Sequence, residues 1–174
     1  MNLFLGLFFL VMNPIFLVDF NLNSNVEDWN IVNDVVMGGK SDSYFSIDSK
    51  GNGSFNGTVS LENNGGFCSV QHYLKPISLS DKKIFRIRLK GDGKKYQFRV
   101  KSNRKDYYSY IYQFQTGKDW ETIDIPISEM YASFRGNKLN IPNYDGSKIE
   151  QIAFLIGNYK EESFELIIDK IEVK

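Results

Sequence analysis

The chain has one cysteine and one histidine among its 174 residues. A single cysteine excludes an internal disulfide, and a chain of this length can bury a core large enough to fold without one. We therefore expect Cys68 to be a small buried apolar residue. A single histidine excludes zinc sites built on histidine pairs, and we expect His72 to have a structural or surface role. The formal net charge of zero argues against general nucleic-acid binding.

Basic residues are absent before Lys40, although the chain begins with an apolar run, Leu3–Met12. The run is too short and too broken for a membrane-spanning helix. A signal or anchor would lack its positive leading region, and it would make the protein exported or membrane-anchored. Alternatively Met12 is the true start, which we favour and which would leave a cytoplasmic protein, or the run is an ordered part of the fold. We expect membrane contact only if this segment is retained.

Helical periodicity longer than two turns is also missing. Instead, about ten short apolar or alternating runs are separated by turns rich in Gly, Asn, Asp and Ser. Phenylalanine and tyrosine are abundant, which favours strands. The sequence thus predicts an all-β fold, a β-sandwich or jelly roll, with residues 1–14 as a hydrophobic N-terminal segment and 15–174 as a single β-sandwich domain.

The clearest local pattern lies at Lys83–Lys90 and Lys95–Lys101, which both alternate apolar and polar residues around a four-residue loop. The pattern predicts a hairpin that pairs Lys90 with Lys95. Its apolar side would face the core and its basic side would face away. The segment 82–105 holds eleven Lys or Arg and one acid, so this side could form a basic surface or pair internally with the acidic flanks.

Alternating tyrosines on the following run, 107–115, could extend this basic side into one patch. The candidate binding face contains Arg86, Arg88, Arg99, Tyr108, Tyr110 and Tyr112. Such a patch could stack on sugar rings or bind a protein surface. The alternative is that the tyrosines belong to the core and the arginines are solvated.

No residue set with the spacing of a catalytic, metal or cofactor site emerges from the chain. Gly38-Gly39 lacks the strand and helix context of a dinucleotide fingerprint. Asp124 alternates within a strand, and we expect it to neutralise one of the arginines across a sheet. The sequence therefore predicts a binding protein rather than an enzyme, with no metal and no cofactor.

One segment is more specific, because it combines a tryptophan, an Asn-Asp pair, a Met-Gly-Gly run and a serine. These residues are Trp29, Asn33, Asp34, Met37, Gly38, Gly39 and Ser41. Later matches follow in order: Gly65-Gly66-Phe67, Arg88 with Gly91-Asp92-Gly93 and Tyr96, Trp120 before Ile125-Pro126, Phe134-Arg135-Gly136, and Ile156-Gly157. From about residue 15 to the end, the chain resembles the complex I intermediate-associated protein 30 family.

The resemblance implies a galactose-binding-like jelly roll without catalytic residues or cofactor. In mitochondria, the family is associated with chaperone-like assembly of respiratory NADH:ubiquinone oxidoreductase, and bacterial relatives exist. The single-domain length and the missing Arg- and Ser-rich transit peptide make this chain look bacterial. Our main hypothesis is a non-catalytic assembly factor that contacts protein partners such as respiratory-chain subunits. The alternative is a carbohydrate-binding module.

Elementary chemistry suggests a structural role for the tryptophan-containing motif. Gly38 and Gly39 allow positive φ or close backbone approach, Asp34 can accept backbone N–H bonds, and Trp29 supplies apolar surface. Phe134-Arg135-Gly136 lies in the longest irregular stretch, residues 132–148. Long loops often carry function, so we regard these three residues as a candidate functional loop.

Overall fold

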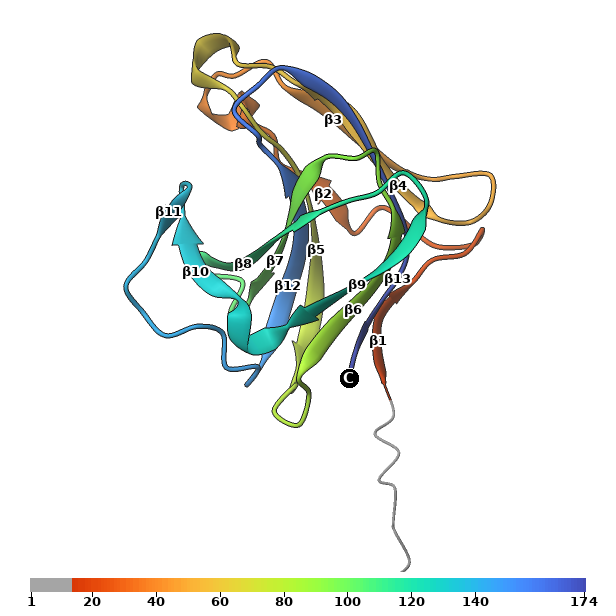
Figure 1. The fold of residues 1–174 in the computed structure, drawn as a ribbon, viewed down its shortest axis with the longest axis vertical. Coiled ribbons are helices and arrows are strands. Elements are labelled where there is room, and N and C mark those ends of the chain that lie inside the picture. Colours follow the sequence, from red (N-terminus) through yellow and green to blue (C-terminus); the bar gives the residue numbers. More distant parts are fainter. Residues whose placement is uncertain (1–13) are drawn as a thin grey trace, which may run out of the picture.

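The computed structural model describes residues 14–174, which form two β-sheets packed face to face (Figure 1). The predictions for the segment 1–14 lie outside this range except for Pro14. Within residues 14–174, no helix has both the length and the apolar character needed to cross a bilayer. All strand pairs are antiparallel, as expected for a sandwich in which each strand has one apolar face.

One sheet has six strands. Its order is β3 (Asp42–Ile47), β4 (Gly53–Val59), β13 (Glu162–Val173), β6 (Ile84–Lys90) and β9 (Trp120–Pro126), and β1 (Ile15–Asp19) pairs with β13. The other sheet has seven strands. Its order is β11 (Asn137–Lys138), β10 (Tyr131–Phe134), β8 (Ser109–Gln115), β7 (Lys95–Lys101), β12 (Ile149–Ile156), β5 (Cys68–Ile77) and β2 (Trp29–Ile31). Three short 3₁₀ turns are η1 (Asp34–Met37), η2 (Glu62–Asn64) and η3 (Ile127–Glu129).

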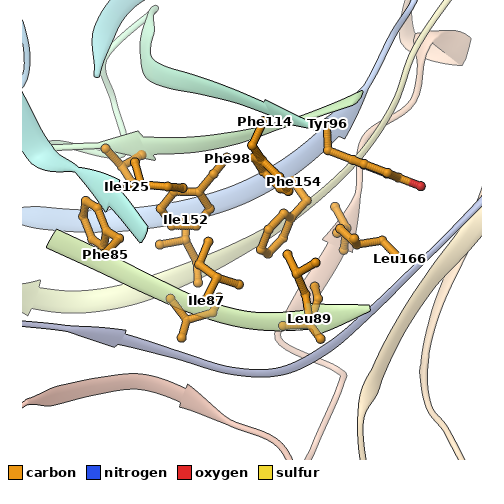
Figure 2. Packing of buried hydrophobic residues seen from close by; sticks show 14 of the residues in the cluster. Phe85, Ile87, Leu89, Tyr96, Phe98, Phe114, Ile125, Ile152, Phe154 and Leu166 are labelled. Atoms are coloured by element: carbon orange, nitrogen blue, oxygen red, sulfur yellow. The ribbon is translucent and has the colours of Figure 1, made fainter. Parts of the chain in front are cut away.

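The core lies between the sheets and is built from alternate residues of their central strands (Figure 2). Phe85 of β6 and Phe98 of β7 meet edge to face across it, with ring centroids 5.3 Å apart. Cys68 is buried, as predicted, and burial raises the pKa of its thiol to about 12. The all-β sandwich predicted from the sequence is confirmed.

The predicted hairpin, however, is wrong. β6 pairs with β13 and β9, whereas β7 pairs with β8 and β12, so the two strands belong to different sheets. The predicted inward residues are correct: Phe85 and Phe98, for example, are fully buried. Two strands that face each other across a sandwich show the same alternation as two strands of a hairpin, so the pattern alone does not separate these arrangements.

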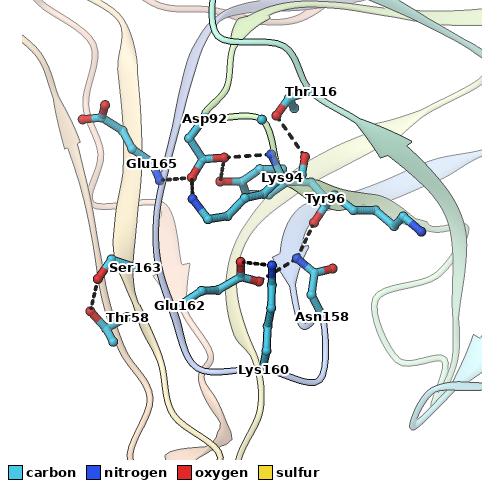
Figure 3. Close-up of polar contacts among 12 residues, drawn as sticks. Thr58, Asp92, Lys94, Tyr96, Thr116, Asn158, Lys160, Glu162, Ser163 and Glu165 are labelled. Atoms are coloured by element: carbon cyan, nitrogen blue, oxygen red, sulfur yellow. Dashed lines mark hydrogen bonds and ion pairs between the residues drawn. The ribbon is translucent and has the colours of Figure 1, made fainter.

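The link between β6 and β7 is held by Asp92 (Figure 3). Its Oδ1 accepts hydrogen bonds from the Lys94 backbone N–H (3.2 Å) and the Tyr96 hydroxyl (3.2 Å). Its Oδ2 accepts one from the backbone N–H of Glu165 on β13 (3.0 Å). Gly91 leaves no room for a side chain, because a Cβ there would lie 2.2 Å from Thr116 Oγ1. The Gly91-Asp92-Gly93 motif, one of the segments that resemble the family pattern, thus stabilises the connection between the two sheets.

Candidate functional site

The predicted basic and aromatic patch is not brought together. Arg86 and Arg88 lie on β6 in the six-stranded sheet, whereas Arg99 lies on β7 in the other. Arg86 donates to both carboxylate oxygens of Asp124 at 2.6 Å, which is the neutralising role expected for Asp124. Arg88 donates to Asp169 at 2.9 Å. Both β6 arginines are therefore satisfied within the molecule.

The three tyrosines divide in a similar way. Tyr110 and Tyr112 pair with Val100 and Phe98, whose side chains are in the core, and both are half-buried against that core. Burial raises the pKa of Tyr110 to about 12. Tyr108 precedes β8, and its ring meets that of Tyr110 at 5.5 Å. The core interpretation of the tyrosines therefore fits Tyr110 and Tyr112.

The seven-stranded sheet carries a different set of polar residues on its outer face. Directly paired residues in an antiparallel sheet share a face, so the register defines rows across the strands. The central row is Tyr131, Ile111, Arg99, Ala153, Gln71 and Asn30. One flanking row is Gln113, Gln97, Leu155 and Ser69, and the other includes Ser133, Ser109, Gln151 and Tyr73.

These rows form the floor of a hollow that we call the sheet groove. A cavity of about 500 Å³ is lined by floor residues that include Gln71, Gln97, Arg99 and Gln151. A second cavity of about 440 Å³ adjoins it and shares Gln97 among its lining residues. Small side chains leave the space open. They are Ser69, Ser109, Ser133 and Ala153.

One wall of the groove comes from the loop that was predicted to be functional. Phe134, Arg135 and Gly136 line the groove at the tight turn from β10 to β11, where Arg135 and Gly136 adopt positive φ values of 47° and 80°. The Arg135 guanidinium lies 5.3 Å from the Phe134 ring centroid. Tyr107 meets the same ring edge to face at 5.2 Å. The loop and the neighbouring Tyr107, which lies between β7 and β8, thus present two exposed aromatic rings and a cation to the groove.

The opposite wall is fastened by Asp34, which is buried. Its carboxylate accepts the backbone N–H groups of Ser41 (3.0 Å), Gly66 (2.6 Å) and Phe67 (3.1 Å), and also the Ser41 hydroxyl. Burial raises the pKa of this carboxyl, but the hydrogen bonds from Ser41, Gly66 and Phe67 outweigh burial and leave the pKa below its usual value of 3.8. Gly39 is required here, because a Cβ would lie 2.3 Å from Asp34 Oδ1.

Other members of the motif continue this scaffold. Asn33 Oδ1 accepts from the Ser43 hydroxyl (2.8 Å) and from the Ser69 backbone N–H (3.3 Å). Trp29 is buried and stacks between Phe45 and His72 at centroid distances of 4.6 and 4.8 Å. Gly38 closes η1 in the left-handed conformation with φ at 92°. Met37 differs, since it is 57% exposed and lines the groove.

Arg99 is the unusual charge on the groove floor. It is half-buried, and among the described residues it forms no ion pair with a carboxylate. Its Nη1 donates to Gln97 Oε1 at 3.3 Å. Burial lowers the pKa of the guanidinium below its ordinary value. Of the described residues that line the two cavities, none is Asp or Glu.

Sequence reasoning missed the glutamines of the groove floor. Gln71, Gln97, Gln113 and Gln151 come from four different strands, and Gln151 donates to Gln71 Oε1 at 3.0 Å. Within its own strand, each has the place of an ordinary residue that faces away from the core. Only the strand order of the sheet places them together.

Solved carbohydrate-binding modules have a fold similar to this two-sheet sandwich. A family 11 module from Clostridium thermocellum, solved with a β-1,3-1,4-mixed-linked tetrasaccharide, is 19% identical with a TM-score of 0.69, over 92% of this chain and 94% of that one. A structure described as CBM4 is 16% identical with a TM-score of 0.54, over 94% of each chain. At these identities the likeness concerns the fold.

The family to which the chain belongs is identified from its sequence. The model of Complex I intermediate-associated protein 30 (CIA30) matches residues 18–168, and the chain belongs to this family. The match spans both sheets and both walls of the groove.

Proposed function

We propose that this chain is a non-catalytic binding protein and that the sheet groove is where it contacts a protein partner. The observation that carries the proposal is the composition of the groove and its rim. Met37 and Tyr107 are 57% and 65% exposed, Phe134 and Arg99 also line the groove, and carboxylates are absent from the described lining residues. Protein interfaces are enriched in aromatic residues, Met and Arg, and they are depleted in Asp and Glu.

Membership of the CIA30 family indicates the kind of partner. The family is named for association with an intermediate of complex I, and we propose that this chain likewise acts in assembly, with respiratory-chain subunits as its first candidate partners. An assembly factor needs a stable docking surface and no reaction chemistry. The motif residues around Asp34 supply that stability, because they fix the position of one wall.

A second candidate function is carbohydrate binding, which a specific observation favours. Side-chain amides from four strands line the groove floor, and aromatic rings of Tyr107 and Phe134 flank it. Amides match sugar hydroxyls as both donors and acceptors, and aromatic faces can pack on sugar rings. A similar fold in a module that binds a mixed-linked tetrasaccharide is compatible with this candidate but does not choose it.

Removing the two exposed rings should separate these functions from a purely structural role. In the double variant Tyr107→Ala and Phe134→Ala, we expect recovery of the protein partner to fall about tenfold or more, because aromatic side chains are prominent among the residues that dominate interface energies. The measurement is quantitative mass spectrometry after co-purification of the tagged full chain from gently solubilised native cells. Tyr44→Ala, an exposed tyrosine on β3 in the other sheet, is the matched control.

Equal recovery of every specific partner with the double variant and the control would contradict the proposal. If no specific protein is recovered with the wild type, a glycan screen with the same three proteins decides the second candidate. Glycan binding that the double variant loses and Tyr44→Ala keeps would establish the carbohydrate function in place of the protein one.

A further inference from the structure

We propose that the sheet groove selects an acidic peptide segment, with carboxylates held by Arg99 and Arg135 and apolar side chains held by the groove rim. This inference rests on the proposed function, since it names the chemistry of the protein partner. It goes beyond that function in predicting charge selectivity. Three observations carry it: the charge of the lining, the setting of Arg99, and the aliphatic residues at one wall.

Every charged residue among the described lining residues of the groove is basic. The larger cavity contains Arg99, Lys101 and Arg135, and its described lining contains no acid. In the adjoining cavity, Lys94 and Lys160 are paired with acids outside the lining, as Figure 3 shows. Among the described residues, the lining cations without an ion pair are therefore Lys95 in this cavity and Arg99, Lys101 and Arg135 in the larger one. A surface of one sign attracts and orients a partner of the opposite sign.

The arginines of β6 differ from Arg99, because each of them forms an ion pair with a carboxylate. Arg86 and Arg88 alternate on their strand as Arg99 does on its own, and each has a carboxylate partner from a neighbouring strand. The strand neighbours of Arg99 in its row are Ile111 and Ala153, which offer no charge. A guanidinium that is partly withdrawn from water gains most from a carboxylate arriving through the open groove, where bidentate pairing is favourable.

The rim favours a polypeptide over an acidic polysaccharide. Met37 and Leu61 line the groove, and Val35 and Val36, which precede Met37 on η1, are exposed. Flexible aliphatic side chains suit the irregular apolar side chains of a peptide. The floor amides of Gln71 and Gln97 can in turn pair with peptide N–H and C=O groups. The fitting occupant is thus an extended segment in which acidic and apolar residues are interspersed.

The test uses a labelled soluble peptide in which glutamates are interspersed with leucine and serine, and a second peptide with lysine in place of each glutamate. Binding to the full chain is followed by fluorescence anisotropy at low and at raised ionic strength. We expect the glutamate peptide to bind, to weaken as salt screens the charges, and to bind about tenfold more weakly to Arg99→Gln. The ion-paired Arg86→Gln is the matched control and should bind like the wild type.

Three results would overturn the inference: equal binding of both peptides, unchanged binding by Arg99→Gln, or no binding of the glutamate peptide at low salt. Polygalacturonate serves as an anionic glycan probe. If the chain binds polygalacturonate but does not bind the glutamate peptide, a peptide occupant is likewise refuted. These results differ from the result expected if the proposed function itself is wrong. If the groove does not bind a protein partner at all, the double variant Tyr107→Ala with Phe134→Ala would keep its partner in co-purification.

Discussion

At the scale of single residues, Asp34 holds one wall of the sheet groove with four hydrogen bonds to its carboxylate. It connects the start of η1 with Ser41 and with the backbone at Gly66 and Phe67, which are distant in sequence. Its role as an acceptor of backbone N–H groups in the loop that follows it was predictable, since a tight loop needs such an acceptor. The partners across the molecule were not, because a sequence pattern carries no information on which distant N–H groups meet one carboxylate.

Replacing Asp34 should reveal this role in the free energy of unfolding. We expect Asp34→Ala to destabilise the protein by about 3 kcal/mol or more at neutral pH, because several backbone N–H groups lose their acceptor together. The folded-state pKa is lowered, so the carboxylate's contribution is present above the usual value of 3.8 and is lost as the pH falls through the folded pKa. Denaturant melts at neutral and acidic pH measure both effects.

The difference between wild type and Asp34→Ala isolates this carboxylate from other acids that titrate in the same range, such as Asp48. That difference should shrink with acidification. A difference that stays constant from neutral pH to below the folded pKa would show that the ionised form of Asp34 contributes nothing specific.

At the scale of strands, the sequence predicted which side chains face the core better than it predicted which strands pair. Alternation at 84–90 and 95–101 correctly predicted which residues point inward, but the same alternation led to a hairpin that the structure does not contain. The choice is made by longer-range packing: β13 and β9 flank β6, and β8 and β12 flank β7. The floor of the sheet groove depends on this strand order, so the sequence alone could not predict which residues form it.

The short strand β2 offers a test at the same scale. Trp29 lies on β2 in the seven-stranded sheet and stacks on Phe45 of β3 in the other sheet, so its ring joins the two sheets. We expect Trp29→Ala to lower the free energy of unfolding by about 3–5 kcal/mol through lost burial and the cavity it leaves. Chemical denaturation measures this loss, and Ile31→Ala, partly exposed on the same strand, should cost about 0.5 kcal/mol or less. Equal losses in the two variants would refute the joining role of the indole.

At the scale of the whole molecule, the net charge of zero conceals two unlike faces. The arginines of the six-stranded sheet are neutralised by Asp124 and Asp169, whereas the groove on the other sheet keeps its cations without lining acids. The basic middle of the sequence allowed either an internally paired or an open arrangement. The fold realises both, because consecutive strands of that segment enter different sheets.

This division predicts that Arg99 reduces stability, as residues kept for binding often do. Its guanidinium is partly withdrawn from water without a carboxylate, and its lowered pKa means that the charged form opposes folding wherever the group is protonated. We expect Arg99→Gln to raise the free energy of unfolding by about 1 kcal/mol. Arg86→Gln, which breaks an exposed ion pair, should lower it by at most about 1 kcal/mol.

Denaturant melts of both variants against the wild type measure this opposite pair of shifts. Combined with the peptide titration, one substitution at Arg99 should then give a protein that is more stable and binds more weakly. A loss of stability in Arg99→Gln would instead mean that the guanidinium supports the fold through its contact with Gln97. The open charge in the groove would then be part of the scaffold, and selectivity for an acidic partner would have to come from Arg135 and Lys101.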